Sequence, residues 1–328
     1  MKELFKINLQ LFAEMNTNVT TDSGLSVEMK TFYDMTLIDE AQPNLVHDQF
    51  GQKRPIPANG GKKIEFRKFA SLPKATTPLT EGVTPDGKKL TAEKIEAEVS
   101  QYGDYIVQSD VLELTSIDNT IVEATKVLGN QAGLTLDTIT RNVLQSGTNV
   151  YYCPKGDGTA VDSRSALDNT CKLTVDVVKK VVAILRANNA PKINGDYVAI
   201  IHPYVAYDLM ADPAWIEAHK YATPENIYEG EIGKIAGVRF VETSEAKVYE
   251  GGVFGSLFIA DGAYGTTEIT GGGLQTIVKQ KGSAGTADPL DQRSSIGWKA
   301  MKTAEILIDP YMMRVESKSA FSADAKVN

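Results

Sequence analysis

The sequence predicts an α+β protein that combines one long helix, an extended β-hairpin and a compact α/β unit. Apolar residues recur every three or four positions over 117–149, as they do on one face of an α-helix. Apolar and polar residues alternate over 63–67 and 95–102, as they do in half-buried strands. Over 172–279, short apolar runs alternate with amphipathic helical segments, which is typical of an α/β unit.

The composition is that of a soluble globular protein, and it argues against several classes. A chain of 328 residues can bury a substantial core and usually holds about two domains. The formal net charge of −8 argues against a nucleic-acid binder that neutralises phosphates. No apolar run approaches the ~18 residues that span a bilayer, so no membrane contact is expected. The first residues resemble a signal peptide, but Asn8 and Gln10 interrupt the apolar part and no cleavage pattern follows.

Residues 1–48 are expected to form an arm. They carry three Lys against eight Asp and Glu, their apolar residues come early, and a short amphipathic helix fits 27–41. This segment has too little apolar surface to build a core of its own. We therefore expect it to lie on another surface or to be disordered.

Residues 49–116 are expected to form a long β-hairpin with an irregular tip. Between the two strands, 72–90 contains three prolines and two glycines, too many breakers for a packed element. Charge is segregated, because 49–92 carries a net +6 and 93–116 a net −5. Opposed cross-strand pairs would neutralise these charges within the hairpin, whereas a basic tip would reach an acidic neighbour. Both interpretations remain open.

The helix predicted for 117–149 would be roughly 45 Å long, well beyond the usual length. Thr115 or Ser116 can cap its start, and Ser146-Gly147 supplies a stop. The residues expected on its buried face are Ile121, Leu128, Leu136, Ile139 and Val143.

The segment that follows, 151–171, is expected to be a surface loop because it is rich in Gly, Asp and Ser. Thr174 then caps a helix, and an apolar strand at 196–201 leads through His202-Pro203 into another helix. Capping or packing is the expected role of His202.

The last part of the chain has the alternation of strands rather than a helical period. Strands are expected at 294–300 and 303–308, with an extended segment at 311–316. No tight hairpin partner is near, so these strands should pair with much earlier ones. The residues expected in their core are Trp298, Ile306 and Ile308.

No motif for catalysis, metal binding or cofactor binding is found. The three histidines lack HExxH spacing, the glycines 271–273 lack the Lys-Ser/Thr of a P-loop, and no GxSxG occurs. Cys153 and Cys171 are expected to be free thiols. We expect no enzyme and no cofactor, although an active site can be assembled from distant residues.

Five stretches, in this order, carry a resemblance: INLQLFA (7–13), GGKKIEFRKFASLPKATTPLTEGVTPDGKKLTAEKIEAEVSQYGDYIVQSDVLEL (60–114), AIIHPYVAYDLMADPAW (199–215), GEIGKIAGVRFVETSEA (230–246) and DPLDQRSSIGWKAMKTAEILIDPYMMRVES (288–317). Together with the order of the parts, they resemble the major capsid proteins of tailed bacteriophages, in particular a family from phages of Gram-positive hosts. The fold of these proteins is shared with the herpesvirus capsid floor.

The resemblance implies a division of the chain into an arm (1–48), an extended loop (49–108), a peripheral domain (109–171 and 280–328) with a spine helix (117–149), and an axial domain (172–279). The loop would lie across a neighbouring subunit. Its candidate intersubunit contacts are Lys62, Lys63, Arg67, Lys68, Lys74, Lys88 and Lys89.

The function that the resemblance implies is self-assembly, as hexamers and pentamers, into an icosahedral shell around double-stranded DNA. The DNA would be held without sequence-specific contacts, and assembly would take place in the host cytoplasm with a portal protein. A separate scaffolding protein is expected, because only about 48 residues precede the hairpin. The alternatives are another self-assembling lattice or encapsulating shell protein, or an unrecognised α/β enzyme.

Overall fold

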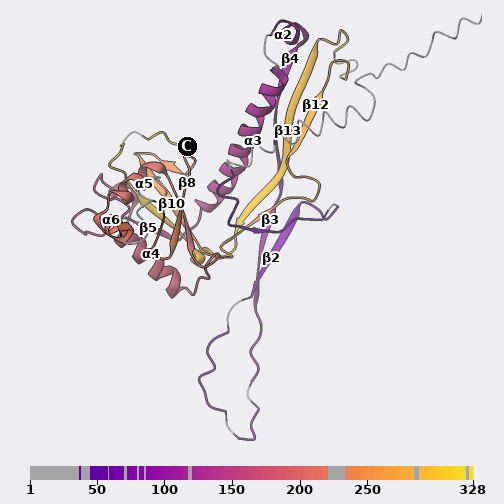
Figure 1. Cartoon of the computed structure of the whole chain (residues 1–328). Helices are drawn as coiled ribbons and strands as arrows, with labels where there is room; N and C mark the ends of the chain where they lie inside the picture. The colour runs from indigo at the N-terminus through magenta and orange to yellow at the C-terminus, as the bar shows by residue number, and fades with distance from the viewer. Residues whose placement is uncertain are drawn as a thin grey trace, which may run out of the picture.

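The computed structural model describes residues 37, 45–57, 59–69, 72–79, 81–84, 86–116, 120–220, 233–283, 288–322 and 325–328. Figure 1 shows an α/β unit beside a long helix with long strands, and a loop that extends beyond both. The helix predicted for 27–41 lies outside the described residues apart from Leu37, which is helical and buried.

The helices are α2 (Asp110–Thr115), α3 (Thr120–Leu144), α4 (Val175–Ala187), α5 (Pro203–Met210) and α6 (Pro213–Lys220), with short 3-10 helices at Arg164–Ala166 and Asp309–Tyr311. The strands are β1 (Gln52–Lys53), β2 (Lys63–Phe69), β3 (Ala92–Glu98), β4 (Ser100–Ser109), β5 (Val150–Tyr152), β6 (Tyr197–Ile201), β7 (Lys234–Ile235), β8 (Val238–Glu242), β9 (Val248–Tyr249), β10 (Val253–Ile259), β11 (Tyr264–Thr267), β12 (Gln275–Lys279), β13 (Arg293–Ile306) and β14 (Met312–Ser317). None of the helices with described residues is long and apolar enough to cross a bilayer.

The α/β unit is built on a seven-stranded sheet in the order β5-β14-β10-β6-β8-β7, with β9 paired to β10. Every residue of β6 and β10 is buried, as expected for central strands covered on both faces. Thr174 caps α4 as predicted by accepting a hydrogen bond from the Val177 N–H. The apolar face of α4 then joins the main core of this unit.

The second sheet follows the order β1-β11-β13-β12, with β4 also paired to β13. β13 is one continuous strand of 14 residues, not the two strands predicted for 294–300 and 303–308. It stays continuous because its partner changes, from β4 along Arg293–Lys302 to β11 from Thr303 onward. The prediction that the closing segment pairs with much earlier strands is confirmed.

The long helix α3 packs one face on this second sheet, side by side with β13 and β4 (Figure 1). At 25 residues it is about 37 Å long. It ends at Leu144 rather than at 149, because the next residues bond elsewhere. The Thr148 N–H and hydroxyl both donate to the Asp309 carboxylate, which draws the chain toward β14.

The two sheets interleave across the predicted domain boundaries. β11 and β12 fall within 172–279 but belong to the sheet of β13, whereas β5 and β14 belong to the seven-stranded sheet. The segment 151–171 was predicted to be a loop, but it begins in β5, which pairs in parallel with β14. A three-residue strand is too short to show an alternating pattern. The domain ranges themselves remain predictions.

Candidate functional site

The feature that stands out from the body of the protein is the hairpin of β2 and β3 with its long tip. The two strands pair antiparallel from Lys63 opposite Glu98 to Phe69 opposite Ala92. The tip beyond them has no regular secondary structure in its described residues and reaches far from both sheets (Figure 1). The predicted hairpin and its irregular tip are therefore confirmed, although the end of the predicted range 49–116 instead forms β4, which pairs with β13, and the helix α2. A projecting hairpin of this kind exposes a large surface per residue.

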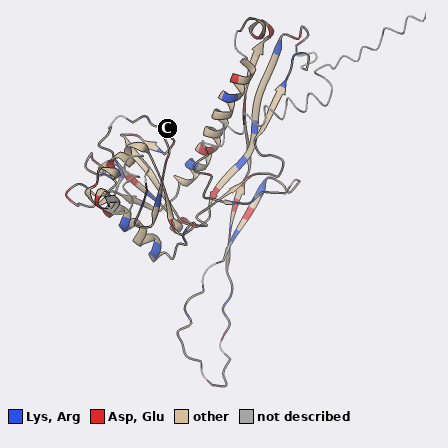
Figure 2. Ribbon diagram, in the orientation of Figure 1, with Lys and Arg blue, Asp and Glu red and all other residues tan. Residues whose placement is uncertain are grey.

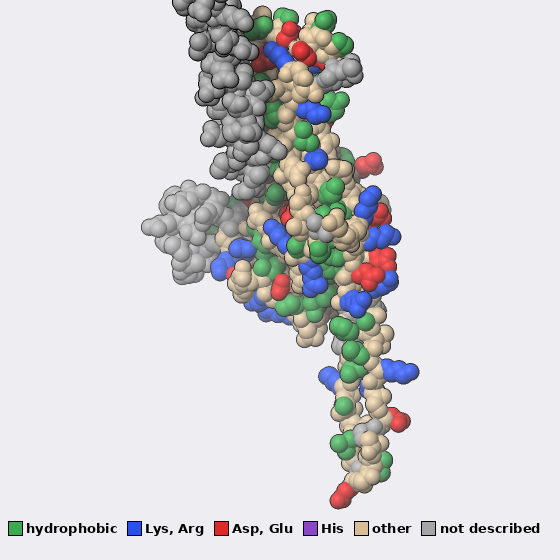
Figure 3. Space-filling view, turned by 90° about the vertical axis from the view of Figure 1, so that its right-hand side faces the viewer, with side chains coloured by type: hydrophobic (Ala, Val, Ile, Leu, Met, Phe, Trp, Pro, Cys, Tyr) green, Lys and Arg blue, Asp and Glu red, His purple; other side chains and the backbone are tan. Residues whose placement is uncertain are grey.

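The basic residues of the loop are exposed, apart from Lys68, whose side chain lies outside the described atoms. Figure 2 marks Lys and Arg positions on the ribbon of the hairpin, and Figure 3 shows basic side chains scattered along the projecting loop. Among the described side chains of the loop, ion pairs join only Arg67 and Lys94 to Glu65 and Glu96. Of the predicted contact residues with described side chains, Lys62, Lys63, Lys74, Lys88 and Lys89 form no ion pair there.

Part of the charge is nevertheless neutralised within the hairpin. Glu65 and Glu96 lie opposite each other, and the Lys94 ammonium bonds to both, at 3.2 Å from Glu65 Oε1. The hydrogen bond to Lys94 lowers the pKa of Glu96, and the same contact raises the pKa of Lys94. Cross-strand neutralisation thus acts near the base of the hairpin, whereas the lysines of the tip form no ion pair with the described residues.

Large apolar side chains are exposed on the same loop, and the sequence reasoning missed them. They are Phe69, Leu72, Leu79, Val83 and Leu90, each more than half exposed. Figure 3 shows apolar side chains interspersed with basic ones down the projecting loop. The sequence did contain a signal for them, because an apolar residue occurs every few positions in a segment that is too rich in Pro and Gly to pack into a core. Exposed apolar surface beside charge is typical of protein interaction sites.

The residues predicted for the spine helix and closing strands lie at the other end of the loop. Leu128, Leu136 and Trp298 are buried together between α3 and β13. The Trp298 indole N–H donates to Gln131 Oε1 at 3.2 Å, which joins strand to helix across the core. Partly buried positions are occupied by Ile121, Ile139, Val143, Ile306 and Ile308.

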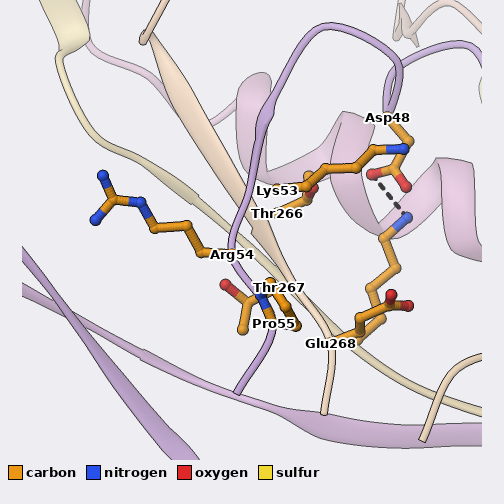
Figure 4. Close-up of a pocket in the computed structure, with 8 residues that line it drawn as sticks. Asp48, Lys53, Arg54, Pro55, Thr266, Thr267 and Glu268 are labelled. Atoms are coloured by element: carbon orange, nitrogen blue, oxygen red, sulfur yellow. Dashed lines mark ion pairs between the residues drawn. The ribbon is translucent and has the colours of Figure 1, made fainter. Parts of the chain in front are cut away.

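The segment 45–50, which leads into the loop, borders a cavity of about 90 Å³ (Figure 4). Its polar side chains do not converge on one point, because Arg54 points away from Lys53 and Asp48. The Asp48 carboxylate is instead held by Lys302, 2.9 Å away. This cavity is lined by Asp48, Lys53, Arg54, Pro55, Thr266, Thr267, Glu268 and Lys302.

Other residues singled out in the sequence have structural roles. His202 caps α5, as predicted, because its Nδ1 accepts a hydrogen bond from the Tyr204 N–H at 3.1 Å. Burial lowers the pKa of His202, so the ring accepts rather than donates. Cys153 and Cys171 are free and buried, and burial raises the pKa of both thiols. Within the described part of the chain, no group of His, Cys, Asp and Glu is arranged to hold a metal ion.

Comparison with solved structures shows the same fold in shell proteins. The capsid protein of cyanophage Pam1 aligns with a TM-score of 0.68 at 11% identity, over 86% of this chain and 93% of its own. For cyanophage P-SCSP1u the TM-score is 0.65 at 14% identity, over 83% and 87%. The virus-like particle protein of Pyrococcus furiosus aligns with a TM-score of 0.51 at 11% identity, over 88% and 99%. At these identities the likeness establishes the fold alone.

Comparison of sequences supplies the family. No curated protein matches this chain at a significant level. The family described as "Phage capsid protein" matches residues 53–273, which is about two-thirds of the chain and includes the loop, α3 and most of the α/β unit. The chain therefore belongs to the phage capsid protein family, as a major capsid protein of the tailed-phage type.

Proposed function

We propose that this protein assembles as hexamers and pentamers into an icosahedral shell around double-stranded DNA, and that the tip of its extended loop docks on a neighbouring subunit. The observation that carries the proposal is the loop itself. It projects from the body, and it combines unpaired basic side chains with five exposed apolar ones. Within the described part of its own chain, this tip has no surface to rest on.

The energetics suit assembly by many weak contacts. Burying one large apolar side chain stabilises by about 1.5–3 kcal/mol, part of which is lost to ordering the loop. Several such side chains dock with each loop, but the cost of association and of ordering the loop is of similar size, so one docked loop is a weak contact. In a closed shell each subunit gives one loop and receives another, so the contacts act together and the assembled state is favoured.

Charge favours an acidic partner surface. The tip lysines Lys74, Lys88 and Lys89 need a counter-charge when they are desolvated. The arm 1–48 carries five more acidic than basic residues, and 93–116 carries the same excess. Both segments of a neighbouring copy suit these three lysines.

The remaining parts of the proposal rest on the resemblance to tailed-phage capsid proteins. The role is structural and uses no catalytic residue or cofactor. The partners proposed are other copies of this chain, a separate scaffolding protein, a portal protein and packaged DNA held without sequence reading. The net charge of −8 fits a shell that does not rely on phosphate contacts. Assembly would take place in the host cytoplasm and yield a virion.

The docking of the loop is tested by reversing the charge of the tip. Lys74→Glu, Lys88→Glu and Lys89→Glu together should abolish shells in electron micrographs and leave a subunit that unfolds at the wild-type temperature. The matched control replaces the same three lysines by arginine, which keeps the charge and should still give shells. If the glutamate variant still forms shells, the docking of this tip is contradicted. It is also contradicted if the variant fails to form shells because the unassembled subunit has itself lost stability.

A further inference from the structure

The segment 45–50 crosses the seam between the two halves of the molecule. Leu45 packs against the core of α3 and β13. Val46 and Phe50 pack against a buried cluster that β6, β10 and β14 of the seven-stranded sheet share with the end of α3 and with β11. The Arg239 guanidinium of β8 lies over the Phe50 ring, 5.6 Å from its centroid. Within six residues the chain therefore contacts both halves. We call 45–50 the seam segment.

Side chains of α3 and β11, both on the side of the second sheet, hold the backbone of this segment at His47. The His47 N–H donates to Asp137 Oδ1 of α3 at 2.7 Å, and the ring Nδ1 lies 2.6 Å from Oδ2 of the same carboxylate. The Tyr264 hydroxyl of β11 donates to the His47 carbonyl oxygen. All three residues are fully buried. The backbone N–H and the carbonyl oxygen of His47 are thus both fixed by side chains of other elements.

The next residue is held in the same way by a third element. The Asp48 carboxylate accepts hydrogen bonds from Lys302 Nζ of β13 at 2.9 Å and from the Thr140 hydroxyl of α3 at 3.2 Å. Lys302 also donates to the Leu136 carbonyl at 3.3 Å. Figure 4 shows the Asp48 ion pair beside the seam. His47 and Asp48 together are therefore tied to α3, β11 and β13.

The buried bonds of His47 and Asp48 fix the position of the seam segment more than they add to the free energy of unfolding. Buried charged and polar networks lose much of their attraction to desolvation, but they tolerate few alternative geometries. Burial raises the pKa of Tyr264 far above its usual range, so its hydroxyl stays a donor. Within the described part of the chain His47 Nε2 has no partner, so the ring is positioned through Nδ1 alone. A shifted seam segment would leave several buried groups unpaired.

We infer that the seam segment is a wedge that fixes the angle between the two halves of the subunit and the direction in which the extended loop leaves them. In a closed shell this angle sets the curvature, so the wedge selects the size of the particle. The inference rests on the proposed assembly. The large cores on either side do not include His47 or Asp48, so release of the wedge should leave each half folded.

A pair of substitutions at Asp137 tests the wedge. Asp137→Leu keeps the volume but removes both bonds to His47, whereas Asp137→Asn can bond to the N–H and, with the other imidazole tautomer, to the ring. Thr125→Val is the control on the same buried face, because the Thr125 hydroxyl bonds only within α3. If Asp137→Leu does not fold, Tyr264→Phe takes its place in the experiment. This substitution removes only the hydroxyl that donates to the His47 carbonyl oxygen.

Two measurements are made on each variant: hydrogen exchange of 45–50 and the distribution of particle diameters in electron micrographs. For Asp137→Leu we expect at least tenfold faster exchange in 45–50, unchanged protection in β10 and β14, and a broadened or shifted diameter. Asp137→Asn and Thr125→Val should match the wild type. Wild-type diameters despite faster exchange would overturn the wedge. A wild-type protein that does not assemble would instead contradict the proposed function.

Discussion

At the scale of single residues, the path of the chain into the loop depends on one missing side chain. A Cβ on Gly51 would lie 2.5 Å from Cε2 of the Tyr264 ring. That ring is fully buried and its hydroxyl is bonded to His47, so it cannot move aside without breaking the contact. Only glycine allows the backbone to pass this close.

Gly51→Ala should therefore lower the free energy of unfolding by about 1–3 kcal/mol, as overpacking usually does. Chemical denaturation of the unassembled subunit measures the change. Gly87→Ala is the matched control, because a Cβ there meets nothing within 4 Å. If both substitutions had the same small effect, the close packing of Gly51 on Tyr264 would be refuted.

Asp168 gives a prediction about pH. Hydrogen bonds from the Thr170 hydroxyl and N–H lower the pKa of Asp168 from 3.8 to about 2. Because the folded pKa lies below the unfolded one, the contribution to stability is complete at neutral pH and is lost as pH falls from about 4 to about 2. An NMR titration should show the low pKa, and Thr170→Val should raise it. A pKa near 3.8 in the wild type would contradict these hydrogen bonds.

At the scale of elements, α3 is stabilised by the packing of its buried face against β13. Leu128 is 2% exposed in the core with β13, whereas the neighbouring Val127 is 63% exposed. Leu128→Ala should lower the free energy of unfolding by about 2–5 kcal/mol, and Val127→Ala by less than about 0.5 kcal/mol. Thermal and chemical unfolding of the subunit measure both. Loss of shells by Leu128→Ala without loss of subunit stability would show that α3 has a direct role in contacts.

The elements that sequence predicts well are those whose signal is local. The face of α3, the cap of α4 and the alternation in β2 and β3 depend on neighbours a few residues away, so their existence was predicted correctly. The predicted end of α3 at 149 lies five residues beyond the observed end at Leu144. The helix stops earlier because Thr148 donates a hydrogen bond to Asp309, which is far along the chain. The continuity of β13 was missed for a similar reason, since it depends on a change of partner.

The seam could not be predicted from sequence. His47 and Asp137 are 90 residues apart and meet only because Leu45 and α3 share a core. Each residue alone is compatible with an exposed position. The exposed apolar residues of the loop were visible in the sequence, but only the structure shows that the described part of the chain leaves them uncovered. Sequence therefore indicated where the loop lies and which charges it carries, but not its apolar contacts or its anchor.

At the scale of the whole molecule, the described parts divide the work of a capsid protein. The α/β unit and the second sheet with α3 each have a large core, and a smaller buried cluster contains residues of both. The seam segment joins them, and the loop projects away from both (Figure 1). The described part of the chain leaves the large apolar side chains of the loop uncovered. In the proposed function, a neighbouring subunit covers them on assembly.

Electron microscopy of the purified protein at high concentration, alone and with a candidate scaffolding protein, tests the central claim most directly. The account predicts hexamers and pentamers that close into shells of uniform diameter. A folded monomer that forms no shell under either condition would contradict it.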